Sequence, residues 1–86
     1  MNRVYILQCH EDTGVDCDSV EVFKTLREAA TAYNRSLKCT AEIFGDDGYK
    51  SYRIPKEEMS EGDINRAYEM TDGGVTHTIS LYSQEL

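Results

Sequence analysis

Hydrophobic residues follow two different spacings along this chain, and each spacing predicts a different element. Residues 4–9 (VYILQC) form a short apolar run with β-branched and aromatic members, which is typical of a strand central in its sheet. Residues 19–25 place Val20 and Val22 on one face and Phe23 on the other, which predicts a second strand. The residues between these strands are polar and include a glycine, so we expect a hairpin loop there.

The strongest pattern is helical and begins at Thr25. Thr25 followed by Glu28 is a capping box, in which each side chain satisfies a backbone N–H group of the first turn. Apolar residues then recur at helical spacing on one face, namely Leu26, Ala29, Ala30, Tyr33 and Leu37. The opposite side carries four bases, Lys24, Arg27, Arg35 and Lys38. We expect Arg35 and Lys38 near the C-terminus of this helix, where its dipole is negative.

A second hairpin is predicted after this helix. Residues 41–44 and 49–54 flank the sequence GDDG, whose Asp-Gly pair suits a tight turn. Pro55 would end the second of these strands, because proline cannot donate a hydrogen bond to a ladder.

A short second helix and a last strand complete the chain. Residues 56–70 are mostly helix-forming, and Ser60 with Asp63 suggests an N-terminal cap. The sequence DGG at positions 72–74 then predicts a turn into residues 75–82, where apolar and polar residues alternate as in a half-buried strand.

These elements predict a single α+β domain over residues 1–86. We expect an antiparallel sheet of about four to five strands, with the well-capped amphipathic helix packed on one face and a short second helix. A chain of this size buries roughly 60% of the surface that its unfolded form exposes. Its stability is therefore expected to be marginal, or to be helped by self-association as a homodimer.

Apolar content and cysteine number predict a cytoplasmic location. No stretch approaches the ~20 apolar residues of a membrane helix, and the apolar run at the N-terminus is too short for a secretory signal. Three cysteines do not form the even-numbered disulfide framework of a small secreted domain. We therefore expect no membrane partner.

The net charge of −7, from 16 acidic and nine basic residues, favours a basic partner. Nucleic acids and anionic membranes need a basic footprint, which this composition opposes. A basic protein or ribonucleoprotein complex is the expected partner. The exception is the segment 24–39, whose basic residues would serve an alternative function, a small nucleic-acid-binding or transcription-regulating module that uses the basic helix face.

The residues able to hold a metal or attack a substrate lack a recognisable spacing. Cys9, His10, Cys17 and Cys39 form no CxxC or HxxxH pattern, and Cys9 and His10 would point to opposite faces of a strand. Asp12, Asp16 and Asp18 lack the order of a calcium-binding loop. We expect no metal, no cofactor and no catalysis, and we expect Cys9 and Cys39 to be small buried residues. A metal- or thiol-dependent enzyme centred on Cys9, His10 and Cys17 is the rival hypothesis.

Two groups of side chains are the candidates for binding a partner. The first hairpin loop supplies acidic residues, namely Glu11, Asp12, Asp16 and Asp18. The second predicted hairpin places carboxylates beside aromatic rings, namely Asp46, Asp47, Tyr49 and Tyr52. Tyrosine is a good interface anchor, and carboxylates suit a basic surface.

The element order also resembles a known class of small proteins. The stretches VYILQCHED and VEVFKTLREAATAYNR, followed by a hairpin and a last strand ending in ISLYSQEL, resemble the short acidic α+β proteins of phages and mobile elements, the anti-CRISPR proteins among them. The resemblance lies in size, charge and element order. It implies a non-enzymatic inhibitor, in which carboxylates stand in for the phosphates of the nucleic acid that a CRISPR effector holds.

Overall fold

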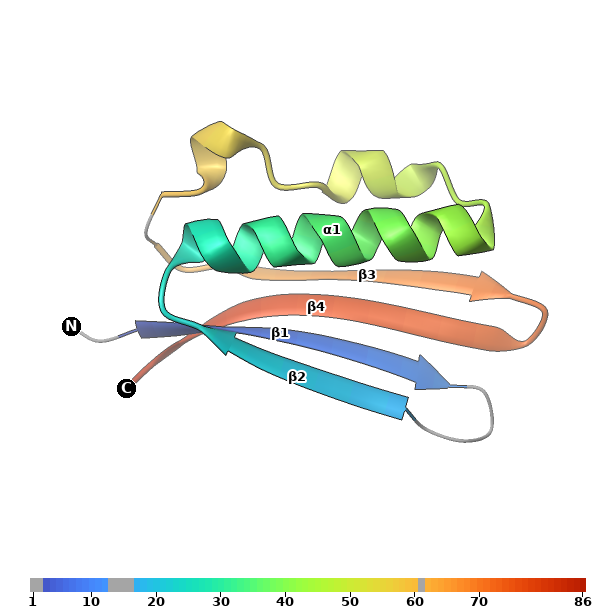
Figure 1. Cartoon of the computed structure of the whole chain (residues 1–86), viewed down its shortest axis with the longest axis horizontal. Coiled ribbons are helices and arrows are strands. Elements are labelled where there is room, and N and C mark those ends of the chain that lie inside the picture. The colour runs from blue at the N-terminus through green and yellow to red at the C-terminus, as the bar shows by residue number, and fades with distance from the viewer. Residues whose placement is uncertain (1–2, 13–16, 61) are drawn as a thin grey trace.

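A four-stranded antiparallel sheet and one long helix make up the fold (Figure 1). The computed structural model describes residues 3–12, 17–60 and 62–86. The elements are β1 (Arg3–Asp12), β2 (Cys17–Phe23), α1 (Leu26–Phe44), β3 (Asn65–Asp72) and β4 (Val75–Glu85). The strand order is β2-β1-β4-β3, so the first and last strands lie side by side in the middle. The predicted α+β class is therefore confirmed, with four strands.

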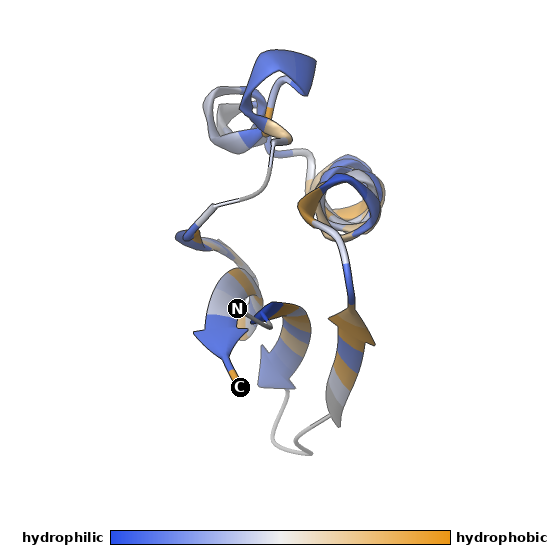
Figure 2. Ribbon diagram, turned by 90° about the vertical axis from the view of Figure 1, so that its left-hand side faces the viewer, coloured by the Kyte–Doolittle hydropathy of each residue, from blue (hydrophilic) through white to orange (hydrophobic). Residues whose placement is uncertain are grey.

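The sheet has one covered face and one open face. Tyr5 and Leu7 of β1 point into the core and are buried, whereas Val20 and Val22 of β2 are 57% and 62% exposed on the other face. Figure 2, which looks along α1, shows the helix and the connection from α1 to β3 on the same side of the sheet. The predicted strands at residues 4–9, 19–25 and 75–82 are confirmed as β1, β2 and β4, with somewhat different ends.

The helix begins where its sequence predicts. The Thr25 hydroxyl accepts a hydrogen bond from the Glu28 N–H at 3.2 Å and donates one to Glu28 Oε1 at 2.9 Å. The predicted apolar face of α1 is buried in full, and Ala41 extends it by one turn. Together with residues of three strands and Ile54, this face forms one core cluster.

The second predicted hairpin is wrong. Residues 41–44 are the last turn of α1, which ends at Gly45 in a left-handed conformation with φ of 66°. Residues 48–52 form a 3₁₀ helix (η1, Gly48–Tyr52) instead of a strand. Arg35 and Lys38 consequently lie well before the end of α1, and its last turn carries no base.

A short second helical segment is present as predicted, but its predicted extent, residues 56–70, is wrong. Only Lys56–Glu58 is helical, as a 3₁₀ turn (η2), and β3 follows from Asn65. Along β3 the even-numbered residues Arg66, Tyr68 and Met70 face the helix and the odd-numbered ones face away, which is strand periodicity. The turn at residues 72–74 is confirmed, because Gly73 and Gly74 both have positive φ and join β3 tightly to β4.

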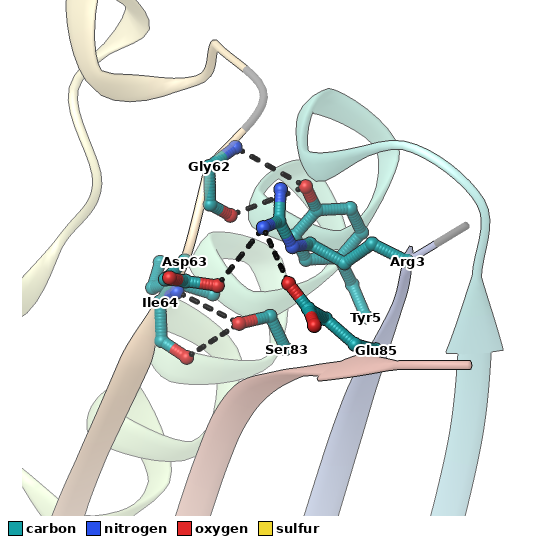
Figure 3. Close-up of polar contacts among 7 residues, drawn as sticks. All are labelled: Arg3, Tyr5, Gly62, Asp63, Ile64, Ser83 and Glu85. Carbon is teal, nitrogen blue, oxygen red and sulfur yellow. Dashed lines mark hydrogen bonds and ion pairs between the residues drawn. The ribbon is translucent and has the colours of Figure 1, made fainter. Parts of the chain in front are cut away.

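The long connection between α1 and β3 is attached to the rest of the fold at several places. On the β3 side, Tyr68 Oη donates to Asp46 Oδ1 at 2.9 Å, and Arg66 Nη1 donates to the Tyr52 and Arg53 carbonyls at 3.1 and 3.3 Å. In the middle, Asn34 of α1 donates to the Ile54 carbonyl and accepts from the Ile54 N–H, both at 2.9 Å. Near its end, Tyr5 Oη hydrogen-bonds the backbone of Gly62, and Ser83 Oγ hydrogen-bonds that of Ile64 (Figure 3). These bonds hold residues 45–60 and 62–64 on the helix side of the sheet.

No described helix combines the length and the apolar content needed to cross a lipid bilayer. Of the two cysteines predicted to be buried, Cys9 is half-buried beside the core and Cys39 is exposed. The Cys39 prediction is wrong because that residue lies on the solvent side of α1, two positions beyond the buried Leu37.

Candidate partner-binding site at the acidic end

Three parts of the chain that are far apart in sequence reach the same end of the molecule. The C-terminal end of β1, the turn between β3 and β4, and the C-terminal end of α1 all lie opposite the chain termini (Figure 1). We call this region the acidic end and define it by five carboxylates, Glu11, Asp12, Glu42, Asp47 and Asp72.

The acidic end lacks compensating charge. None of its five carboxylates has a lysine or arginine within two positions along the chain, and the nearest bases are Lys38 and Lys50. In the part of the chain that the structure describes, Asp12, Glu42, Asp47 and Asp72 form no ion pair with a base. The negative pole of α1 points the same way, and no base in its last turn offsets it.

The opposite end, near the termini, has its charges paired. The Arg3 guanidinium lies 3.2 Å from Asp63 Oδ1 and 3.5 Å from Glu85 Oε1 (Figure 3). Arg66 approaches Glu58 Oε1 at 3.6 Å. Along its longest dimension, 43 Å, the molecule thus carries the ion-paired carboxylates Glu58, Asp63 and Glu85 at one end, whereas four described carboxylates at the other end form no ion pair with a base.

The structure brings some of the predicted site residues together at this end. Glu11 and Asp12 are consecutive on β1 and therefore lie on opposite faces. Glu11 faces the helix side, where its Oε1 lies 3.6 Å from His77 Nδ1, and Asp12 is exposed. Asp16 lies outside the described residues. Asp18 belongs to β2 opposite His10, and its side chain also lies outside the described part.

Of the two carboxylates predicted as contacts in residues 46–52, one is bonded within the fold and the other is exposed. Asp46 Oδ1 accepts a hydrogen bond from the Gly48 N–H at 2.7 Å and from Tyr68 Oη at 2.9 Å, so it anchors the chain after α1. Partial burial, and then the neighbouring Asp46 carboxylate, raise the pKa of Tyr68, which keeps its hydroxyl protonated as the donor. Asp47 is exposed.

The two tyrosines of this segment make contacts within the fold. Tyr49 packs against the core, and Tyr52 packs on Tyr68 with ring centroids 4.5 Å apart and the rings tilted by 46°. Neither ring is therefore placed beside the carboxylates of the first hairpin, and the pair serves mainly to hold residues 48–52 against β3.

A shallow groove of about 290 Å³ opens at the acidic end, and most of its residues were missed from the sequence. Apolar atoms of Ile43, Phe44 and Val75 line it, between Glu11 on one side and Asp72 on the other. Ile43 is 82% exposed. The signal that could have found Asp72 is its position as the first residue of DGG, since a hairpin of β3 and β4 brings that turn to the end where β1 finishes.

The candidate metal and thiol residues are not assembled. Cys9 and His10 lie on opposite faces of β1, Cys39 is on the solvent side of α1, and the Cys17 side chain lies outside the described residues. Among residues 3–12, 17–60 and 62–86 no three His, Cys, Asp or Glu side chains are grouped to hold a metal ion. Burial raises the pKa of the Cys9 thiol, which lowers its thiolate fraction and hence its reactivity.

Two of the four basic residues of segment 24–39 lie beside acidic residues. Arg27 and Arg35 border a groove between α1 and β2 that Glu21 and Glu28 also line. Lys24 and Lys38 are exposed, one before α1 and one on its solvent side. This face is mixed in charge, in contrast to the acidic end.

Comparison with protein-family models, with curated proteins and with solved structures finds no match to this chain, so its function is argued from the fold and the acidic end.

Proposed function

We propose that this protein is a non-enzymatic inhibitor of a basic nucleic-acid-handling complex, of the CRISPR effector kind, and that it works by occupying the site where the complex holds nucleic acid. The observation that carries the proposal is the acidic end. Three separate segments that carry its five carboxylates reach this end (Figure 1), and among the described residues four of these carboxylates form no ion pair with a base. The phage origin and the host cytoplasm as the place of action belong to the same proposal.

The physical argument is one of charge complementarity. A channel that binds nucleic acid is lined by bases and concentrates anions by its field, so an end rich in carboxylates is attracted to it as phosphates are. Complementary fields of this kind mainly raise the association rate and select the partner. The uncompensated helix pole adds to the same field.

The acidic end also includes a carboxylate whose position is unfavourable for the stability of the fold. Glu42 lies in the last turn of α1, where a carboxylate meets the negative pole of its own helix. A cationic partner would convert this unfavourable field into binding free energy. The acidic end is therefore better suited to association than to stability.

Affinity capture from a nuclease-treated lysate of a CRISPR-carrying host tests the proposal. We expect one complex to be retained near stoichiometrically, to be weakened between about 50 and 200 mM salt, and to be released by an excess of the nucleic acid that it normally holds. Retention that the nucleic acid does not reverse would contradict occupation of its site. Capture that requires intact nucleic acid would overturn the proposal in favour of the face formed by Lys24, Arg27, Arg35 and Lys38.

A further inference from the structure

The groove at the acidic end combines two surface chemistries that one kind of side chain matches. Its floor is apolar, from Phe44, Val75 and Ile43, while a carboxylate stands at each side. A purely aliphatic ligand would leave the carboxylates desolvated and unpaired, and a bare cation would leave the apolar floor in water. The matching group has an apolar stem and a cationic head.

The sheet register places the two carboxylates on the same face of the sheet, on the two strands that flank β4. Glu11 is opposite His77 on β4. Asp72 is opposite Val75, which comes two residues before His77 on the same strand. All four positions share the face that α1 covers, by the alternation of each strand. Glu11 and Asp72 are therefore separated by the width of β4 and flank the last turn of α1.

Neighbouring contacts fix the groove's shape. The rings of Phe44 and His77 meet edge to face with centroids 6.3 Å apart, which holds Phe44 over the sheet. His77 Nδ1 lies 3.6 Å from Glu11 Oε1, and Glu11 lines the groove. Ile43 is not part of the core cluster, and its 82% exposure gives the groove a free apolar wall.

We propose that this groove binds an arginine side chain of the basic partner, with the arginine stem on Ile43 and Val75 and the guanidinium between Glu11 and Asp72. This inference rests on the proposed function, whose partner it describes more closely. Arginine fits better than lysine because its planar head donates in several directions at once and is more weakly hydrated than an ammonium group. The uncompensated carbonyl end of α1 favours the same cation.

The test uses n-butylguanidinium as the probe and needs no partner protein. Methyl-resolved NMR of the whole chain should show saturable shifts at Ile43 and Val75, with a dissociation constant on the order of millimolar for so small a ligand. Butylammonium, guanidinium chloride and 1-butanol should each bind about ten-fold more weakly or without saturation. Equal binding of butylammonium or butanol would overturn the arginine assignment.

Paired variants localise the site. Glu11→Gln/Asp72→Asn should weaken butylguanidinium binding by about ten-fold, whereas Glu57→Gln/Glu69→Gln, with the same change of charge at exposed positions away from the groove, should leave it unchanged. Ile43→Ala, at a side chain that the fold does not use, should weaken binding with no loss of stability. Equal binding by both double variants would show that the groove is not the binding site of butylguanidinium.

The two proposals can fail separately. If butylguanidinium occupies the groove but Glu11→Gln/Asp72→Asn inhibits the captured complex as well as the wild type, the proposed function of the acidic end fails. If the probe does not bind while that variant loses inhibition, the inhibitor proposal stands and the proposal of arginine binding in the groove fails.

Discussion

Leu37→Ala is expected to lower the free energy of unfolding by about 3 kcal/mol, because it leaves a cavity that the surrounding side chains fill only in part. Leu37 is fully buried on α1, against a core built from one face of a single sheet. A chain of this length has a total stability of roughly 4–13 kcal/mol. The variant should therefore unfold at a much lower denaturant concentration.

Denaturant unfolding followed by circular dichroism measures this effect. Lys38→Ala is the matched control, since it lies one residue further along the same helix with its side chain exposed, and a change of less than about 0.5 kcal/mol is expected. Coincident unfolding curves for the two variants would show that the helix does not pack on the sheet as described.

Asn34→Ala is expected to cost about 2 kcal/mol and to release the connection between α1 and β3. The Asn34 amide makes both hydrogen bonds of the Ile54 backbone, and the Ile54 side chain is only 2% exposed. Removing the amide leaves a backbone N–H and a carbonyl unpaired in a region with little water. No other described bond in the middle of residues 45–64 ties this segment to α1.

Amide hydrogen exchange read by mass spectrometry separates local release from general destabilisation. In Asn34→Ala, residues 46–60 should exchange faster by a larger factor than β4, because the sheet ladder does not depend on this attachment. Arg35→Ala, an exposed change at the next position, should alter neither. Uniform acceleration throughout the chain would contradict the anchoring role of Asn34.

The sequence predicts the elements whose determinants are local. The Thr25 side chain caps the helix by accepting from the Glu28 N–H, and the Glu28 carboxylate accepts from the Thr25 hydroxyl. The apolar spacing of α1 needs no other part of the chain to be recognised. The same holds for the alternation in β4 and for the Gly73-Gly74 turn, where both residues must adopt positive φ. These features establish the α+β class and the helix on one face of the sheet.

Residues 41–70 were assigned wrongly because their pattern fits two periods. Ile64, Ala67 and Tyr68 have helical spacing, but Arg66, Tyr68 and Met70 have strand spacing, and pairing with β4 decides between them. In residues 41–44, Phe44 is fixed by its contact with His77, which lies 33 positions away. Such contacts cannot be read from a local window.

The candidate site was predictable in part. Glu11 and Asp12 were identified from charge alone, whereas Asp72 and Ile43 join them only through the strand order β2-β1-β4-β3 and the extension of α1 to Phe44. Asp46 was identified as a contact, yet its carboxylate accepts two hydrogen bonds within the fold. Charge along the chain therefore indicates the chemistry of the partner, and only the topology shows where the charges meet.

Competition with nucleic acid for the captured complex, using charge-neutralised variants, tests the central claim most directly. Glu42→Gln/Asp72→Asn removes two charges from the acidic end, and Glu57→Gln/Glu69→Gln removes two elsewhere. The first variant should be at least as stable as the wild type, because Glu42 opposes its own helix pole. It should nevertheless need about ten-fold more protein to displace labelled target nucleic acid, while the second variant should match the wild type. Equal displacement by the two variants would contradict the account.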